Sequence, residues 1–391
     1  MKSLRIALFT YSTKPRGGVV HTLSLAEELA RLKHRVHIYA LSTGEGFFRP
    51  VSVPYYTLIP CAIVANESID DKVKRYISTY ADYLSSVREN YDIYHAEDCI
   101  SANMLCELRS RGSIKFFLRT VHHIDDFTSR SLIDCQLKSI LEPDYIIVVS
   151  RFWEKELRSR YSLNPTVINN GVDIKKFKNQ GEEGIKEKAK NSFSVNGNNV
   201  MLSIGGIEPR KNTLTALRAF KIASNYFKSK GERLVWLIGG GETLFDYRAY
   251  REEFFSEIKR LGLKLDEDII ILGTVPEDSM VNLYQAGDVF VFPSVKEGWG
   301  LVVLEAMASG LPIIASGIEP MTDYLKEGEN ALLVSPMDYE ALAQQIIRVL
   351  DKSDFRDRLI INGIKTAQAY SWQNTALRHS EFYSRILERV R

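Results

Sequence analysis

Two glutamates separated by seven residues give the clearest chemical signal in this sequence, Glu297 and Glu305. An apolar run at 289–292 predicts a strand, and a helix is expected over 301–309. Glu297 would lie in the loop between them, and Glu305 about two turns into the helix. A carboxylate on the helix can accept both hydroxyls of a ribose, and one in the loop can accept sugar hydroxyls. Two surface glutamates beside a turn would show the same spacing.

The residues between the two glutamates suit an anion. Their order is Gly298, Trp299, Gly300 and Leu301. Backbone N–H groups at the start of a helix have no partner within the helix, so a diphosphate can bind there. The glycines let a phosphate approach the backbone closely.

A second segment, Gly205 to Asn212, follows the predicted strand 200–204 and opens another helix. It contains two adjacent cations, Arg210 and Lys211. A guanidinium offers a planar fork and an ammonium offers a point charge, and both suit a diphosphate leaving group. Taken alone, the segment fits a solvated basic loop equally well.

A glycine pair, Gly17 and Gly18, lies between a predicted strand at 5–10 and a predicted helix at 20–33. The pair resembles a loop that cradles phosphate, but it lacks the G-x-G-x-x-G pattern of dinucleotide sites. Many turns between a strand and a helix contain two glycines, so this signal is weak by itself.

Histidines and acids lie at the ends of two further predicted strands in the first half. His95 and Glu97 accompany one strand, and His122 follows the next. Such histidines can act as general acids or bases, or as hydrogen-bond donors, and a buried structural role is equally common. Asp125 and Asp126 beside the histidines could suggest a metal, but no other residue has ligand spacing, so no metal site is predicted.

Short β-branched runs alternate with longer amphipathic runs along the chain, which predicts parallel sheets covered by helices on both faces. Strands are expected at 5–10, 35–41, 91–95, 115–121, 144–149, 166–168, 200–204, 234–238, 269–272, 289–292 and 312–315. Helices are expected at 20–33, 100–111, 152–161, 213–226, 278–286, 301–309, 339–350, 355–370 and 372–390.

The segment 173–198 has the lysine, glycine and asparagine content of a linker around a short helix. Two α/β domains are therefore predicted, divided between residues 176 and 177. Ligands of open α/β sheets bind beyond the carboxyl ends of the strands. Two such edges facing each other would form a cleft for a two-substrate reaction.

The composition sets the class of protein. With 391 residues, 45% of them hydrophobic, the chain can form two packed domains, and a net charge of +2 gives no support for a nucleic-acid partner. A slight basic excess in the first half is compatible with an anionic acceptor or peripheral contact with a membrane. The four cysteines lack zinc spacing, the start lacks a signal-peptide layout, and no apolar run reaches the ~20 residues of a membrane span. A cytoplasmic protein is expected.

Together these segments resemble the retaining glycosyltransferases of family 4, which have the GT-B fold. The resemblance covers nearly the whole chain in the right order, and Glu-Gly-x-Gly-Leu…Glu is its specific element. The corroborating matches are Gly17-Gly18 for the first glycine loop, His122 for the active-site histidine, Ser150 for a "VS" turn, Asn169 to Asp173 for an "NGVD" segment, and Ser371-Trp372 for the start of the last helix.

The resemblance implies two Rossmann-like domains facing each other across a cleft. The last helix would cross back, so that 1–176 with 372–391 forms the acceptor-side domain and 177–371 binds the nucleotide sugar. It also implies that the protein transfers a glycosyl group, in the first place a hexosyl group. The transfer would retain the configuration and would not need a metal. No cofactor is expected beside a UDP- or GDP-sugar donor, and the acceptor would be a small molecule, a glycan or a lipid-linked sugar.

The resemblance also assigns roles to residues. Arg210 and Lys211 would stabilise the leaving diphosphate, His122 would contact the donor sugar or acceptor, and Glu297 would hold the donor sugar. The predicted donor-binding residues are Gly17, Gly18, Gly298, Trp299, Gly300, Leu301 and Glu305. The predicted acceptor-side residues are His95, Glu97 and Ser150.

The chain departs from the family pattern at three places. Gly206 stands where an arginine is usual, and Arg210 is the candidate replacement. Glu97 stands where some relatives have a second histidine, and Glu319-Pro320 replaces a common glycine pair.

Other functions remain open from sequence. A nucleotide-sugar epimerase would need further acids near the anomeric carbon, and a sugar phosphorylase would need a lysine-bound pyridoxal phosphate. A non-catalytic sugar-binding protein would fit the glycine at position 206, and hydrolysis of a nucleotide sugar would exclude it. A dehydrogenase lacks its dinucleotide fingerprint. The base, the sugar, the acceptor and the oligomeric state are not specified by the sequence.

Overall fold

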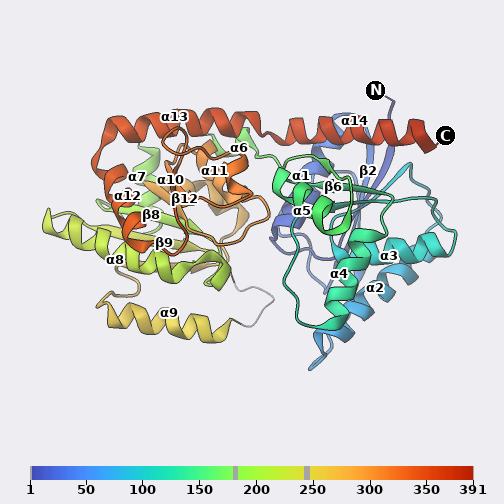
Figure 1. Cartoon of the computed structure of the whole chain (residues 1–391), viewed down its shortest axis with the longest axis horizontal. Helices are drawn as coiled ribbons and strands as arrows, with labels where there is room; N and C mark the ends of the chain where they lie inside the picture. The colour runs from blue at the N-terminus through green and yellow to red at the C-terminus, as the bar shows by residue number, and fades with distance from the viewer. Residues whose placement is uncertain (1, 179–183, 242–246, 391) are drawn as a thin grey trace. The chain divides into compact units, whose positions relative to one another are not determined.

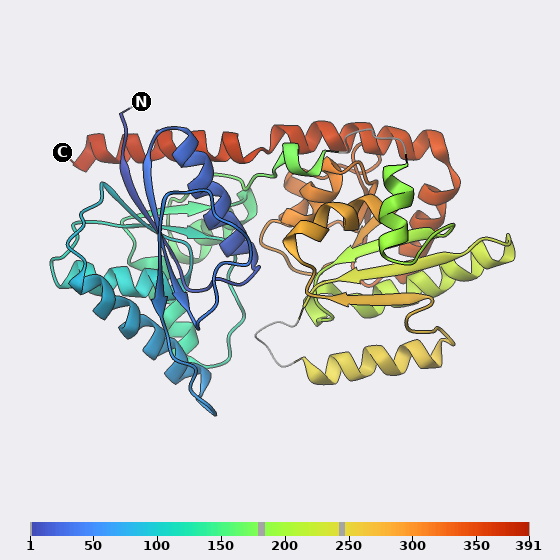
Figure 2. The ribbon, with the colours of Figure 1, turned by 180° about the vertical axis from the view of Figure 1, so that it is seen from behind.

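The chain folds into two compact units in the computed structural model, which describes residues 2–178, 184–241 and 247–390. Unit 1 comprises Met1–Asn170 and Trp372–Arg391, and unit 2 comprises Gly171–Ser371. Each unit is built on one parallel sheet with helices on both faces (Figures 1 and 2).

Unit 1 contains a seven-stranded sheet in the order β3-β2-β1-β4-β5-β6-β7. The strands are β1 (Arg5–Thr10), β2 (Arg35–Ser42), β3 (Tyr55–Pro60), β4 (Ile93–Ala96), β5 (Leu118–Val121), β6 (Tyr145–Val148) and β7 (Thr166–Val167). The helices are α1 (Gly17–Arg31), α2 (Ile69–Ser86), α3 (Cys99–Ser110), α4 (Arg130–Leu141), α5 (Arg151–Tyr161) and α14 (Trp372–Val390). Helices α2, α3 and α4 lie on one face of the sheet, and α1 and α14 lie on the other (Figure 1).

Unit 2 contains a six-stranded sheet in the order β10-β9-β8-β11-β12-β13. The strands are β8 (Asn199–Ile204), β9 (Leu234–Gly239), β10 (Ile269–Gly273), β11 (Val289–Phe292), β12 (Ile313–Ser316) and β13 (Leu332–Val334). The α-helices are α6 (Ile174–Phe177), α7 (Ile185–Ser192), α8 (Thr213–Ser229), α9 (Arg248–Arg260), α10 (Met280–Ala286), α11 (Leu301–Ala308), α12 (Tyr339–Asp351) and α13 (Ser353–Ala369). A short 3-10 turn, η1 (Pro209–Lys211), precedes α8.

The strand order indicates where a ligand-binding crevice lies at the edge of each sheet. In unit 1 the chain order reverses between the neighbouring strands β1 and β4, and in unit 2 it reverses between β8 and β11. Loops that leave neighbouring strands in opposite directions open a crevice at their carboxyl ends, and ligands of such sheets bind there. The loops after these four strands therefore position the site.

The predicted strands and helices occur at or near their expected positions, but five elements lay outside the prediction: β3, β13, α2, α4 and α9. Strand β3 is at the sheet edge, and its Tyr55 and Tyr56 are about half exposed, so it lacks the apolar run of a central strand. An apolar run of this kind predicts a buried parallel strand, so an edge strand that lacks the run is not predicted.

The segment 173–198 is not a plain linker. Its described residues contain α6 and α7, and α6 packs within unit 2, where Phe177 contacts the ring of Tyr284. Residues 179–183, in the middle of the segment, lie outside the described residues. The division between the units falls at Asn170/Gly171 rather than between residues 176 and 177.

The last helix, α14, returns to unit 1, as expected. Its residues Ala376, Tyr383 and Ile386 join the core formed with β1 and α1. Their spacing of three and seven residues puts them on one face of the helix. Two hydrogen bonds fix the register: His34 Nε2 to Ser380 Oγ at 2.7 Å, and Thr375 Oγ1 to the Asn169 carbonyl at 2.9 Å.

Within the described ranges, no helix combines the length and the apolar character that crossing a membrane requires.

Replacement of Ile386 tests the return of α14. Ile386 is 2% exposed in the core of unit 1, so Ile386→Ala should lower the free energy of unfolding of this unit by about 2–5 kcal/mol. Urea-induced unfolding, monitored through the transition of unit 1, measures this change in the free energy of unfolding. Leu377→Ala, at a position on the same helix that is 36% exposed, is the control and should change little. Equal effects of the two changes would contradict the packing.

Candidate active site

The glycine loop after β8 brings Lys211 into the interior of unit 2. Gly205 has φ +149°, and a Cβ built there would lie 2.8 Å from Lys211 Cε. The lysine stem therefore occupies space that any other residue at 205 would fill. The Lys211 ammonium lies over the ring of Phe292, 4.6 Å from its centroid. This loop thus requires glycine for a close approach and directs a cation toward the end of β11.

Glu297 joins the two cations. Its Oε1 accepts from Lys211 Nζ at 2.6 Å, and its Oε2 accepts from Arg210 Nη1 at 2.9 Å. Arg210 also donates to Glu208 Oε1 at 2.9 Å, so its guanidinium bridges two carboxylates. The side chains of Glu297 and Lys211 are 7% and 13% exposed, whereas Arg210 is 40% exposed. Arg210 is thus the most exposed of the three side chains.

These contacts decide the charge states. Burial alone would raise the pKa of Glu297, but Lys211 and Arg210 outweigh it and hold the pKa below its usual value. Burial lowers the pKa of Lys211, assisted by the charge of Arg210 and opposed by Glu297. The two carboxylates, Glu297 and Glu208, balance the charges of Lys211 and Arg210, so the cluster is close to neutral overall, and Arg210 is its more exposed cation.

Glu305 lies in the first turn and a half of α11, since the helix begins at Leu301. The helix begins where predicted, but Glu305 is only its fifth residue, so it lies about one turn into the helix rather than the predicted two. Tyr284, from α10, donates its hydroxyl to Glu305 Oε2 at 2.6 Å. Burial raises the pKa of Glu305 to about 7. The remaining lone pairs of the carboxylate are available to ligand hydroxyls.

The loop between the glutamates is held by packing. Gly300 has φ +86°, and a Cβ there would lie 3.0 Å from both Met321 Sδ and Tyr324 Oη. The Tyr324 hydroxyl donates to the Trp299 carbonyl at 3.0 Å. The Trp299 ring is buried against Tyr324, with centroids 4.9 Å apart. Trp299 therefore supports the loop by packing in the interior of unit 2. Gly298 precedes Trp299 in this loop, and Gly300 and Leu301 form the start of α11.

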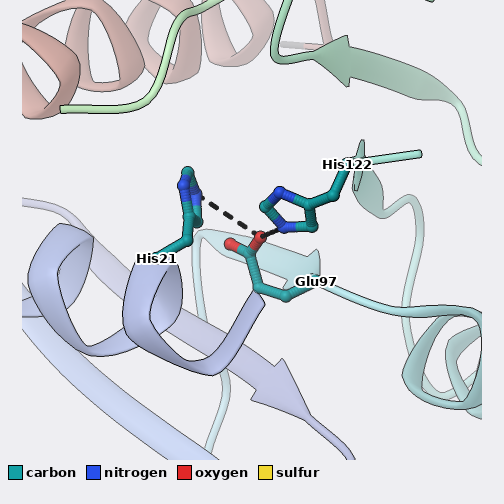
Figure 3. Close-up of side chains that lie close together, drawn as sticks. All are labelled: His21, Glu97 and His122. Carbon is teal, nitrogen blue, oxygen red and sulfur yellow. Dashed lines mark hydrogen bonds and ion pairs between the residues drawn. The ribbon is translucent and has the colours of Figure 1, made fainter. Parts of the chain in front are cut away.

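Unit 1 brings together a second polar group, whose members are His21, Glu97 and His122 (Figure 3). They come from α1 and from the segments after β4 and β5, and their side chains converge. Glu97 Oε2 lies 3.2 Å from His122 Nε2 and 3.5 Å from His21 Nε2. His21 Nδ1 lies 2.9 Å from Asn170 Oδ1, at the end of unit 1. The predicted pair Glu97 and His122 thus has a third partner.

Burial makes this group nearly neutral. It lowers the pKa of His21 and of His122 to about 3, and it raises the pKa of Glu97 to about 7. Removing an ionisable group from water disfavours its charged form, whichever the sign. The histidines are consequently neutral near pH 7, whereas Glu97 titrates near that pH.

The other candidates of unit 1 have different surroundings. His95 is fully buried, and its ring nitrogens contact Tyr383 Oη and Thr120 Oγ1, both at 2.7 Å. Ser150 is buried and caps α5, accepting from the Trp153 N–H at 3.2 Å. The structure therefore places neither side chain at the surface of the unit.

The glycine pair opens α1. Gly17 is the first residue of the helix, and a Cβ on it would meet no atom within 4 Å. A Cβ on Gly18 would lie 3.8 Å from His122 Cδ2, in ordinary contact. Gly18 therefore leaves the edge of the His122 ring uncovered.

Sequence reasoning missed His21 and Tyr284. Each lies on a helix, one turn or more from the motif that it serves, and each contacts a residue from a distant segment. The signal available for His21 was its position four residues after Gly17, on the helix that the glycine pair opens. Nothing local distinguishes Tyr284.

Both units match known families. Residues 184–366 match glycosyl transferases group 1, and residues 15–176 match glycosyltransferase family 4. An uncharacterized glycosyltransferase of Methanocaldococcus jannaschii is 26% identical, over 98% of this chain and 99% of its own. A D-inositol 3-phosphate glycosyltransferase of Corynebacterium glutamicum is 24% identical, over 97% of this chain and 96% of its own.

Solved structures share the fold. Sucrose-phosphate synthase from Thermosynechococcus elongatus has a TM-score of 0.81 at 21% identity, covering 98% of this chain and 99% of that chain. Anabaena HepE in complex with UDP-glucose has a TM-score of 0.77 at 18% identity, covering 97% and 99%. Two Rossmann-like units with these family matches define a glycosyltransferase of the GT-B fold. The chain belongs to glycosyltransferase family 4.

Replacement of Glu297 tests the buried ion pairs. Glu297→Gln leaves Lys211 buried without its counter-charge, so the free energy of unfolding of unit 2 should fall by about 3 kcal/mol at pH 7. The pKa of Glu297 is lowered in the folded state, so its stabilisation is present above the unfolded pKa of about 4.5 and is lost as the pH falls through the folded pKa.

Denaturant unfolding of the wild type and the variant at pH 7 and at pH 3 measures this. The stability difference should shrink at the lower pH. Glu253→Gln, at an exposed position on α9, is the matched control. A difference that is independent of pH would mean that charge is not the cause.

Proposed function

We propose that this glycosyltransferase transfers a hexosyl group from a UDP- or GDP-sugar to an acceptor, with retention of configuration and without a metal at the diphosphate. The observation that carries the proposal is the arrangement of Lys211, Glu297 and Arg210 beside the start of α11. Anabaena HepE in complex with UDP-glucose supports a nucleotide-sugar donor.

The donor would bind to unit 2. The ribose hydroxyls would donate to Glu305, whose carboxylate has only one oxygen bonded to Tyr284. The diphosphate would lie at the start of α11, near Gly300 and Leu301, where backbone N–H groups favour an anion. Arg210 would reach the diphosphate from its exposed face and thereby replace the arginine that is missing at Gly206. Glu297 would hold the donor sugar and the two cations together.

The reaction breaks the bond between the anomeric carbon of the sugar and the diphosphate oxygen. The acceptor oxygen forms its bond on the same face of the sugar, and the proton of the acceptor hydroxyl goes to the leaving phosphate oxygen. Negative charge grows on the diphosphate as the bond breaks. Cations and helix N–H groups already in position stabilise that charge without reorganising, which is often the largest catalytic effect.

Unit 1 would supply the groups that contact the reacting sugar or the acceptor. His122 is the candidate, since it is 13% exposed while its partner Glu97 is 1% exposed. A neutral imidazole can donate or accept a hydrogen bond to a hydroxyl without competing for the diphosphate. Glu97 and His21, which are more buried, would then orient the ring of His122. The acceptor would be a small molecule, a glycan or a lipid-linked sugar.

Release of nucleoside diphosphate tests the proposal. The purified chain is incubated with UDP- and GDP-sugars, with and without candidate acceptors, in the presence of a chelator. Release that depends on one base and one sugar is expected, even without acceptor, because hydrolysis competes with transfer. Turnover that requires an added divalent metal, or binding without any turnover, would contradict it.

The affinity for the donor should fall as the pH falls from 8 to 5. Ribose hydroxyls donate to the ionised form of Glu305, whose pKa is about 7 in the free protein. Below pH 7 a proton competes with the ribose, at a cost that approaches about tenfold in affinity for each pH unit. Calorimetric titration with a nucleotide sugar measures this, since its diphosphate diester does not titrate in the range.

Glu305→Gln is the control for this prediction. The variant should bind more weakly at pH 8, by about ten- to a hundredfold, because it loses hydrogen bonds to a charged group. Its affinity should also be nearly independent of pH. A pH dependence that persists in Glu305→Gln would mean that another group titrates.

Removal of the Lys211 charge should lower kcat more than it raises KM. The leaving diphosphate gains charge in the transition state, so the cation acts there more than on the bound substrate. Steady-state kinetics of Lys211→Met measures both constants, with Lys228→Met, at an exposed position on α8, as the control. A change confined to KM would instead indicate equal binding of ground and transition states.

A further inference from the structure

The polar group of unit 1 has the donor atoms of a metal site. His21 Nε2, a Glu97 carboxylate oxygen and His122 Nε2 all lie within 4.8 Å of one another. Figure 3 shows the two imidazole rings directed at the same carboxylate oxygen of Glu97. Two imidazoles and one carboxylate form the ligand set of zinc sites that keep a fourth position open.

The separations fit an ion. Zinc binds nitrogen and carboxylate oxygen at about 2.0–2.2 Å, so neighbouring ligand atoms at tetrahedral angles lie roughly 3.3–3.6 Å apart. Glu97 Oε2 lies 3.2 Å from His122 Nε2 and 3.5 Å from His21 Nε2. Both separations are close to the coordinated values. The two imidazole nitrogens lie within 4.8 Å of each other, so a ring rotation can complete the set.

The hydrogen bond of His21 selects the tautomer that binds metals. Asn170 Oδ1 can only accept, so His21 Nδ1, 2.9 Å away, donates. The lone pair of the neutral ring is then on Nε2, which faces Glu97. Histidines that bind metals nearly always donate their other N–H to an oxygen in this way.

Two buried acceptors in the group lack a donor. His21 Nε2 and Glu97 Oε1 have no hydrogen-bond partner among the described residues. The side chains of His21 and Glu97 are 0% and 1% exposed. A buried polar atom without a partner is costly, and most such atoms in proteins have one. A cation bound at His21 Nε2 would satisfy the lone pair of that nitrogen, which no donor among the described residues reaches.

We propose that His21, Glu97 and His122 bind a divalent transition metal of the zinc type. The imidazole nitrogens favour such ions over Mg²⁺ and Ca²⁺, which prefer oxygen ligands. His122, the most exposed of the three, lies on the side from which the ion enters. The open fourth position faces the same side and takes a water molecule.

The site has a consequence that rests on the proposed function. The metal would replace the contact between His122 Nε2 and Glu97 Oε2, which orients the His122 ring in the proposed function. The metal is therefore an inhibitor of transfer rather than a participant, and a chelator restores activity. Binding of the metal itself does not depend on the proposed function.

The test uses the full chain without a histidine tag, after treatment with a chelator. Zn²⁺ is titrated by calorimetry, and Co²⁺ is added as a visible probe of four-coordinate geometry. One equivalent of Zn²⁺ should bind, and Co²⁺ should give the intense absorption of a four-coordinate site. If Zn²⁺ binds no more tightly than it does to a single surface histidine, the proposal is overturned.

Variants locate the site. Glu97→Gln keeps the shape of the side chain and His122→Gln lies partly at the surface, and each should weaken Zn²⁺ binding by more than about tenfold. His123→Gln is the control, since His123 is the adjacent histidine, is 52% exposed and contacts Asp125 outside the group. Circular dichroism and thermal unfolding establish that each variant is folded. Unchanged binding in folded Glu97→Gln and His122→Gln would place the metal elsewhere and overturn the proposal.

Kinetics separate this proposal from the proposed function. If the chain transfers sugar, Zn²⁺ should inhibit the wild type in proportion to the occupancy measured by calorimetry. If no donor is turned over, the proposed function fails, while the binding measurement still decides on the metal site. Transfer that is unaffected by Zn²⁺ at full occupancy would overturn the inhibitory role.

Discussion

The ion pairs of Glu297 with Lys211 and Arg210 are the constraint on which the chemistry of unit 2 depends. Charges are tolerated near the interior only when they are paired, and here Glu297 and Glu208 balance Lys211 and Arg210 at the edge of the sheet. The pairing is possible because β8 and β11 are neighbouring parallel strands that end at the same edge. Gly205 then provides the space in which the Lys211 stem lies. Packing thus fixes the charges before a ligand arrives.

Unit 1 uses burial in the opposite sense. Its histidines have lowered pKa values and Glu97 has a raised one, so the group is close to neutral near pH 7. One topology therefore positions an ion-paired group in unit 2 and a group of neutral imidazoles with one carboxyl in unit 1. The difference comes from the partners at the strand ends, Lys211 and Arg210 in one unit and imidazoles in the other. A diphosphate suits the first, and sugar hydroxyls or a metal ion suit the second.

The sequence predicted the fold and the strands that position the site, because buried strands and amphipathic helices leave local patterns. It also selected Glu297, Lys211 and His122 as candidates, since each lies in the segment that follows a buried strand. It did not predict the contacts between segments. The bond of Tyr284 to Glu305 joins residues 21 positions apart, and that of His21 to Asn170 joins residues 149 apart. Edge strand β3 was missed because it lacks a long apolar run, and segment 173–198, for which one short helix was predicted, contains two.

Hydrogen exchange of the full chain, followed by mass spectrometry with and without the nucleoside diphosphate, tests the central claim most directly. The claim is that the strand ends of β8 and β11 in unit 2 bind the donor. Bound ligand should slow exchange in segments 205–212 and 298–305, because their backbone N–H groups become hydrogen-bonded or less accessible. Saturating ligand that leaves both segments unchanged, or that protects only segments of unit 1, would contradict the account.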